Sequence, residues 1–224
     1  MRIYTKTGDD GMTSLGAGKR AAKHDPYVTC LGNLDELNSN IGYLIALINE
    51  QRESFRLCDN LQRIQHTLFD IGSGIIGVHP YGDKIHEYME AELIFLESEI
   101  DKMQAALPPL KQFILPGGCK VSAYVHVVRS VCRRAERSVV ALLCQEEKLA
   151  QNKPNAQTAS VLKYINRLSD FFFVLARCCQ KDDELYWKKM NHGASACTGS
   201  ASKTTEKYQK KWFTSWFTWS PHFA

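Results

Sequence analysis

The residues best suited to chemistry by type and spacing stand near the start of the chain, in the stretch TKTGDDGMTSLGAGKRAAK at residues 5–23. Its glycines allow the backbone to turn successive N–H groups onto one concave surface. Turned amides, hydroxyls and ammonium groups are the donors that a polyphosphate requires. Composition alone favours a plainer alternative, a flexible and solvated N-terminal loop. The stretch offers glycines such as Gly8, the hydroxyls of Thr5, Thr7, Thr13 and Ser14, and positive charges that include Lys6 and Lys23.

This stretch matches neither of two common phosphate-binding loops. A Walker A loop requires Ser or Thr after its Lys, but Lys19 is followed by Arg20. A dinucleotide-binding turn requires a buried strand before it and a long helix directly after it, and the sequence predicts neither. A phosphate site here would therefore be of another kind.

A second candidate is the row of charges in HVVRSVCRRAERSVV, residues 126–140. Arg129, Arg133 and Glu136 follow one another at steps of four and three, one residue displaced from the apolar positions of the same segment. The charged row therefore borders the buried face of a helix. Glu136 could orient Arg133 and leave its donors free for an anion. An interhelical ion-pair network is an equal alternative.

A third candidate is the pair Asn166 and Asp170 in KYINRLSDFFFVLAR, four residues apart on one helical face. An Asn side chain both donates and accepts hydrogen bonds, so the pair could hold a ribose or an adenine edge. The same two side chains could equally bond to helix ends or to each other.

Five segments must position these residues, and each repeats apolar residues at alternating steps of three and four. A mean period of 3.5 keeps neighbouring helices in register. The predicted fold is therefore all-α, a five-helix antiparallel bundle with an irregular Gly-rich N-terminal segment. The segments are 34–48, 57–75, 89–107, 121–142 and 161–179.

Local signals mark the expected ends of these helices. Asn33 followed by Glu36 resembles a capping box that opens the first helix. Pro108 and Pro109 end the third, and the Pro-Gly-Gly at 116–118 breaks the chain before the fourth. The one strand-like piece expected is a short extended stretch at residues 2–5.

The formal net charge of the 224 residues is +4. Residues 191–224 contribute most of it, with four Lys and one Glu, so the rest of the chain is nearly neutral. A neutral body argues against a nucleic-acid partner. We expect residues 1–190 to form the bundle and residues 191–224, basic and rich in Trp, to be an unstructured tail. The alternatives for the tail are an interfacial anchor, a docking segment or an RNA-binding element.

The eight cysteines form no CxxC pair, which favours free thiols in a reducing compartment over a disulfide or metal scaffold. The densest apolar run, 171–176, is far shorter than the roughly 18 residues of a transmembrane helix. The start of the chain resembles neither a signal peptide nor a presequence. The expected location is the cytoplasm, or the mitochondrial matrix if a eukaryotic presequence is missing from this chain.

Five ordered motifs together resemble one family, the PduO-type ATP:cob(I)alamin adenosyltransferases, from Ile3 to about Lys189. They are TKTGDDGMTSLGAGKR, GNLDELNSNIG, ILPGG, HVVRSVCRRAERSVV and YINRLSDFFFVLAR. The resemblance implies a homotrimeric five-helix bundle with active sites between subunits. It implies transfer of the 5′-deoxyadenosyl group of ATP to the cobalt of cob(I)alamin, with Mg²⁺ on the released triphosphate. A non-catalytic corrinoid or nucleotide carrier is the alternative.

The resemblance also implies roles for single residues. Asp35 would pair across the subunit interface with Arg129, and Phe113 would crowd the lower face of the corrin. Seven residues of the glycine-rich stretch would hold the triphosphate, namely Thr5, Lys6, Thr7, Gly8, Thr13, Ser14 and Lys23. ATP would be bound by Arg133, Arg134, Glu136, Arg137 and Asn166.

Co(I) is itself a strong nucleophile, so the protein needs no Ser–His or Cys–His pair. No metal ligand from the protein is expected with certainty, because the triphosphate of ATP would coordinate the Mg²⁺. A reductase and an adenosylcobalamin-dependent acceptor enzyme stay open as partners. One departure from the family is Cys119, which follows the Pro-Gly-Gly turn where Ser or Thr is expected and is a weaker helix cap.

Overall fold

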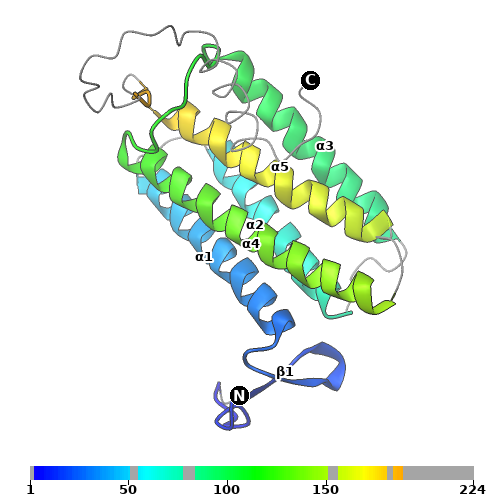
Figure 1. Cartoon of the computed structure of the whole chain (residues 1–224). Coiled ribbons are helices and arrows are strands. Elements are labelled where there is room, and N and C mark those ends of the chain that lie inside the picture. The colour runs from blue at the N-terminus through cyan, green and yellow to red at the C-terminus, as the bar shows by residue number, and fades with distance from the viewer. Residues whose placement is uncertain (1–2, 51–54, 78–83, 151–155, 181–183, 189–224) are drawn as a thin grey trace, which may run out of the picture.

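The computed structural model describes residues 3–50, 55–77, 84–150, 156–180 and 184–188. Within these ranges the chain forms five long helices, and successive helices run in opposite directions (Figure 1). The all-α class and the five-helix bundle predicted from the apolar period are therefore confirmed. The helices are α1 (Pro26–Glu50), α2 (Phe55–Ile75), α3 (Ile85–Ala105), α4 (Lys120–Ala150) and α5 (Ala156–Cys179).

The apolar faces of these helices meet in one continuous core. Helix α1 packs against α2 and α4, and α5 packs against α4 and α3. The predicted apolar positions are the buried ones: Leu37 and Ile41 of α1, Val128 of α4 and Phe172 of α5 are fully buried. Each such side chain stabilises the bundle by roughly 1.5–3 kcal/mol relative to exposure. The core thus fixes which face of α4 and α5 remains for a site.

Helix α1 begins eight residues before the sequence-predicted start. Asp25 caps it, because the Asp25 Oδ1 atom accepts a hydrogen bond from the Tyr27 N–H at 2.8 Å, and Pro26 occupies the first helical position. Asn33 lies inside the helix. The capping-box assignment at Asn33 is therefore wrong, and the Asp-Pro dipeptide was the signal that locates this helix start.

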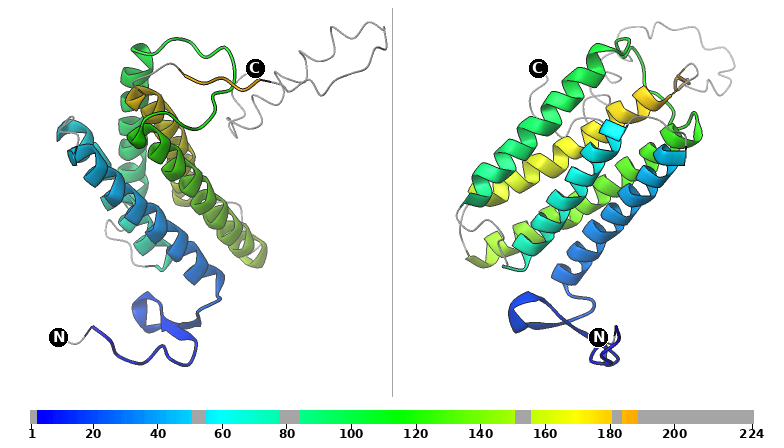
Figure 2. Two further views of the ribbon diagram at one scale, coloured as in Figure 1. Left: turned by 90° about the vertical axis from the view of Figure 1, so that its left-hand side faces the viewer. Right: turned by 180° about the vertical axis from the view of Figure 1, so that it is seen from behind.

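The glycine-rich stretch contains a small hairpin. Strands β1 (Met12–Ser14) and β2 (Arg20–Ala22) pair antiparallel, and the short 3-10 helix η1 (Gly16–Gly18) joins them. The hairpin projects beyond the end of the bundle at which α1 begins (Figures 1 and 2). The prediction of a strand near residues 2–5 is wrong for the described residues Ile3, Tyr4 and Thr5, which form no strand.

A long connection, residues 106–119, leads into α4 and pairs with a segment that follows α5. The Leu115 N–H donates to the Leu185 carbonyl and the Trp187 N–H to the Phe113 carbonyl, both at 2.7 Å. Figure 2 shows residues 184–188 running beside the connection. The tail predicted for residues 191–224 lies outside the described residues.

The described helices do not include one with both the length and the apolar character that crossing a membrane requires.

Candidate functional site

Residues 5–23, here called the strap, hold their first turn in a specific backbone conformation. Lys6 has a positive φ of 60°, which a residue with a side chain rarely adopts without a local reason. The Thr5 and Thr7 hydroxyls lie 2.8 Å apart, and the Asp9 N–H points to the Lys6 carbonyl. The side chains of Thr5, Lys6 and Thr7 are exposed. Their hydroxyl and ammonium groups are therefore available to a ligand.

The hairpin brings Lys23 back to this turn. A Cβ atom at Gly8 would lie 3.5 Å from the Lys23 Nζ atom, an ordinary contact, and 3.2 Å from the Met12 carbonyl oxygen, a tight one. The Lys23 N–H also donates to the Gly11 carbonyl at 2.9 Å. Thr13 and Ser14 stand on β1 in the same hairpin. The strap thus brings Lys23 to the turn at Gly8, while Thr13 and Ser14 lie on the first strand of its hairpin.

Part of the charged row of α4 already forms hydrogen bonds and ion pairs within the single chain. Glu136 does not orient Arg133 through its Oε1 atom, which accepts a hydrogen bond from the Asn166 Nδ2 atom of α5 at 2.9 Å. Arg134 forms an ion pair with Glu36 of α1, and the Arg137 Nη1 atom donates to the Arg133 carbonyl at 3.0 Å. Asn166 and Glu136 therefore form one polar unit that bridges α4 and α5.

Asp170 takes a different partner from Asn166. It accepts a hydrogen bond from Arg167 at 3.2 Å, and Arg167 also donates to Glu97 of α3 at 3.1 Å. Burial raises the pKa of the Asp170 carboxyl, although the charge of Arg167 opposes this shift. The prediction that Asn166 and Asp170 could act together is not supported by their bonds, because Asn166 turns to α4 and Asp170 to Arg167.

Two side chains one turn apart on α4 have a buried nitrogen without a partner among the described residues. They are His126, through Nδ1, and Arg129, through Nε. Burial lowers the pKa of Arg129, and the nearby charge of Arg133 lowers it further. Asp35, its predicted partner, is exposed on α1. An unpaired buried guanidinium nitrogen is costly, so the Nε atom of Arg129 is a point of unsatisfied hydrogen bonding within the single chain.

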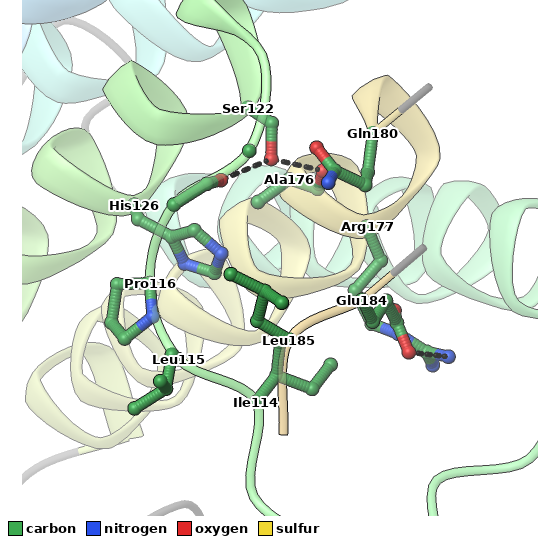
Figure 3. Close-up of a pocket in the computed structure, with 12 residues that line it drawn as sticks. Ile114, Leu115, Pro116, Ser122, His126, Ala176, Arg177, Gln180, Glu184 and Leu185 are labelled. Atoms are coloured by element: carbon green, nitrogen blue, oxygen red, sulfur yellow. Dashed lines mark hydrogen bonds and ion pairs between the residues drawn. The ribbon is translucent and has the colours of Figure 1, made fainter. Parts of the chain in front are cut away.

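Phe113 lies at the bundle end where α4 begins, and its ring meets that of Trp187 edge to face at 6.4 Å between centroids. Next to it a pocket opens between the 114–118 turn and the adjoining ends of α4 and α5 (Figure 3). His126 and Leu185 point into this space. Arg177 borders the pocket and donates to Glu184 at 2.6 Å. No sequence pattern points to Trp187 or to the Arg177–Glu184 pair, because both depend on how the chain pairs after α5.

The strap and the charged row do not meet within one chain. Over the ranges that the structure describes, no hydrogen bond or ion pair joins residues 5–23 to α4. The strap lies instead beyond the start of α1 (Figure 1). The fold and these residues define a helical bundle with two separate cationic surfaces, one on the strap and one on α4, and an aromatic corner at Phe113.

Comparison with known proteins identifies the family. The model of the cobalamin adenosyltransferase family matches residues 3–179. The corrinoid adenosyltransferase of Bacillus subtilis (strain 168) is 44% identical over 177 residues, which cover 79% of this chain and 86% of that protein. Human corrinoid adenosyltransferase MMAB is 41% identical over 180 residues, which cover 79% of this chain and 68% of that protein. This chain belongs to the cobalamin adenosyltransferase family.

Solved structures agree with this assignment. A variant of the PduO-type ATP:corrinoid adenosyltransferase from Lactobacillus reuteri, complexed with cobalamin and ATP, superposes with a TM-score of 0.69 at 36% identity and covers 84% of this chain and 100% of its own. A second variant of that enzyme, complexed with ATP, has the same TM-score at 37% identity, and the match covers 83% of this chain and 100% of that one.

Proposed function

We propose that this protein transfers the 5′-deoxyadenosyl group of ATP to the cobalt of cob(I)alamin and releases adenosylcobalamin and triphosphate. The observation that carries this function is that one family model spans both the strap and the bundle. Relatives at about 40% identity are named corrinoid adenosyltransferases. A structural neighbour holds both substrates, cobalamin and ATP.

The protein's own part in this reaction is to position two substrates and to neutralise charge. Cob(I)alamin is the nucleophilic substrate, so the bond forms from cobalt to the 5′ carbon as the bond from that carbon to the triphosphate breaks. Negative charge develops on the leaving triphosphate. Fixed cationic groups aimed at that charge lower the barrier without reorganising.

We assign the charge-neutralising groups to two surfaces. Within the strap, the triphosphate is bound by Thr5, Lys6, Thr7, Gly8, Thr13, Ser14 and Lys23. The Thr and Ser hydroxyls among them are hard oxygen donors that suit the Mg²⁺ of Mg-ATP. The α4 row and Asn166 bind the remainder of ATP, with Glu136 holding the Asn166 amide in place. Phe113 forms the apolar wall below the corrin.

A homotrimer with active sites between subunits is the assembly that fits these positions. Lys120, at the start of α4, pairs with Glu50 at the end of α1 at 3.7 Å, so the Phe113 corner and the strap lie at opposite ends of α1. Helix α1 has 25 residues, which is about 37 Å at 1.5 Å per residue. A single chain therefore separates the strap from Phe113 by more than the length of ATP.

Exposed groups on the α1–α4 face support such an interface. Tyr43 and Val127 are about half exposed, and the unpaired Nε atom of Arg129 lies on the same pair of helices. Asp35 of a partner subunit would supply the missing acceptor. This assignment explains both the apolar exposure and the unsatisfied guanidinium.

The chemistry also implies partners and surroundings. Cob(I)alamin must be supplied by a reduction, so we propose a reductase upstream and an adenosylcobalamin-dependent enzyme as the acceptor. The described cysteines are all free, which fits the two reducing compartments expected from the sequence, cytoplasm or mitochondrial matrix.

An anaerobic assay with ATP and chemically reduced cobalamin tests this function. We expect ATP-dependent loss of the cob(I)alamin absorbance with triphosphate as product. Arg133→Ala and Asn166→Ala should each lower the rate by about 100-fold, the cost of removing one preorganised donor. Arg56→Ala, which removes an exposed arginine of α2, is the matched control and should keep the wild-type rate. Adenosylcobalamin binding without transfer would favour a carrier instead.

A further inference from the structure

Arg20 is the side chain that ties the first turn of the strap to its hairpin. It stands at the start of β2, and its Nη2 atom donates to the Thr7 carbonyl oxygen at 2.7 Å. The same nitrogen lies 3.6 Å from the Asp10 Oδ1 atom, which in turn accepts the Met12 N–H at 3.1 Å. One guanidinium therefore connects the turn at Thr7, the loop at Asp10 and β2.

The bond to the Thr7 carbonyl fixes the direction of an amide. The peptide that joins Thr7 to Gly8 is trans, as are all the peptide bonds described, so its C=O and N–H point in opposite directions. With Arg20 on the carbonyl side, the Gly8 N–H is directed away from Arg20. Lys6, just before Thr7, has a left-handed φ of 60°, and turns that contain such a residue can direct successive N–H groups onto one concave anion-binding surface.

Other contacts hold this turn less tightly. Its two internal backbone bonds, from the Asp9 N–H to the Lys6 carbonyl and from the Gly11 N–H to the Gly8 carbonyl, are 3.5 and 3.3 Å long. These are at or beyond the long end of normal hydrogen bonds. The charge-assisted bond from Arg20 is shorter than either and stronger in kind.

We propose that Arg20 is a positioning residue for the triphosphate: it holds the Thr7–Gly8 peptide so that the Gly8 amide faces the phosphate, and it does not itself bind the phosphate. This inference rests on the proposed function of the strap and deepens it. The Nη2 atom of Arg20 is already engaged, because it donates to the Thr7 carbonyl and lies 3.6 Å from the Asp10 carboxylate. A guanidinium used in this way acts through geometry rather than through net charge.

Binding of inorganic tripolyphosphate, measured by calorimetry on the full chain, isolates the strap from the adenine and corrin sites. Arg20→Gln should weaken tripolyphosphate about tenfold, the effect of losing one charge-assisted hydrogen bond. In the transferase assay the same variant should raise KM for ATP about tenfold while kcat falls less than twofold. Arg20→Lys, which keeps one donor but not the planar fork, should recover part of the loss.

Lys19→Gln is the control for charge, because it removes the same unit of charge one residue away at an exposed position. It should change tripolyphosphate affinity by less than twofold. Asp10→Asn distinguishes positioning from a net-charge effect, because the two predict opposite changes in tripolyphosphate affinity. The substitution adds net positive charge but loosens the pairing of Arg20. Weaker binding in Asp10→Asn supports positioning, and tighter binding overturns it, as does an equal loss in Lys19→Gln and Arg20→Gln.

The inference and the proposed function can fail separately. If the wild-type protein turns over ATP and cob(I)alamin while Arg20→Gln behaves as wild type, the positioning role is wrong and the function stands. If Arg20-dependent tripolyphosphate binding is found without transfer, the function is wrong and the role of Arg20 stands. Helical circular dichroism and melting temperature should match wild type in all variants, because Arg20 lies outside the bundle.

Discussion

His126 is a buried histidine whose protonation state is coupled to folding. Its side chain packs 6.3 Å from the ring of Phe173, and burial, followed by the charge of Arg129, lowers its pKa to about 4. In the unfolded chain a histidine titrates near 6.5. At pH values between about 4 and 6.5, the imidazole of His126 is protonated in the unfolded state but not in the folded state. Stability is therefore lost as the pH falls from about 6.5 towards 4.

We expect His126→Gln to reduce this pH dependence. The free energy of unfolding of the wild-type protein, measured by urea titration, should fall from pH 7 to pH 5, and the fall should be smaller in the variant because Gln does not titrate. His66→Gln is the control, since His66 is exposed on α2 and should leave the fall unchanged. Equal falls in wild type and His126→Gln would contradict the prediction.

The Arg63–Glu92 pair is a residue-scale feature of the opposite side of the bundle. Arg63 donates to both carboxylate oxygens of Glu92, at 2.9 and 2.8 Å, and its guanidinium lies 4.0 Å from the Phe95 ring centroid. The Glu92 side chain is only 6% exposed against 47% for Arg63. Most of the desolvation cost therefore falls on the carboxylate, which depends on Arg63 for compensation.

Arg63→Ala should destabilise the protein by about 2 kcal/mol, below the full cost of breaking a buried pair because Arg63 is half exposed. Urea unfolding measures the difference. Arg56→Ala removes an exposed partner of Glu99, 3.7 Å away, and should cost less than about 1 kcal/mol. If the two substitutions lower the free energy of unfolding equally, the bidentate Arg63–Glu92 pair stabilises the protein no more than an exposed ion pair does.

At the scale of elements, the start of α4 depends on an unusual cap. The Ser122 N–H reaches the Cys119 Sγ atom at 3.5 Å, which is the N-cap bond of the helix made with sulfur in place of oxygen. The same thiol donates to the Cys179 carbonyl at the end of α5, at 3.0 Å. A thiol is a weak acceptor, so this helix start is held less firmly than a Ser or Thr would hold it.

Cys119→Ser should therefore stabilise the protein, by about 0.5–1 kcal/mol. For a chain of this size the melting temperature would rise by about 2–4 °C. Cys119→Ala should lower it, because both bonds are lost. Cys144→Ser, at an exposed position of the same helix, should leave it unchanged. A lower melting temperature in Cys119→Ser than in Cys119→Ala would show that the sulfur is packed rather than used as a cap.

The helices could be predicted from the sequence because burial imposes a period that neighbouring residues reveal. Leu37 and Ile41 are fully buried where the period placed them. The β1–β2 hairpin was missed because strands of three residues are too short to show alternation. The start of α1 was missed because Asn33 and Glu36 have the spacing of a capping box inside a helix that Asp25 already caps.

Sequence motifs single out the candidate site residues, but they do not reveal which side chains those residues contact. Glu136 bonds to Asn166, 30 residues away, and a sequence pattern on one helix reveals only neighbours three or four positions apart. The role of Arg20 likewise depends on the hairpin that brings it to Thr7. Contacts between distant segments follow from packing, which single-sequence periodicity does not encode.

At the scale of the whole molecule, the proposed function places one active site between two copies of the chain. In the proposed trimer, a closed ring of three chains would present the strap of each subunit to the α4 row of the next, the head-to-tail arrangement of a heterologous interface. The expected mass in solution is three times the 25.4 kDa of the chain, measurable by light scattering. Asp35→Arg should disrupt the ring, because it places a like charge beside Arg129.

Hybrid trimers test the shared site directly. Lys23→Ala disables the strap and Arg133→Ala disables the α4 row, so each variant alone should be nearly inactive. When the two are co-expressed, a site between subunits is intact wherever a good strap meets a good row. Random assembly of equal amounts makes about one quarter of the sites intact, so about one quarter of the wild-type activity should return. A site contained within one chain would never be intact in such mixtures, and no recovery would then be seen.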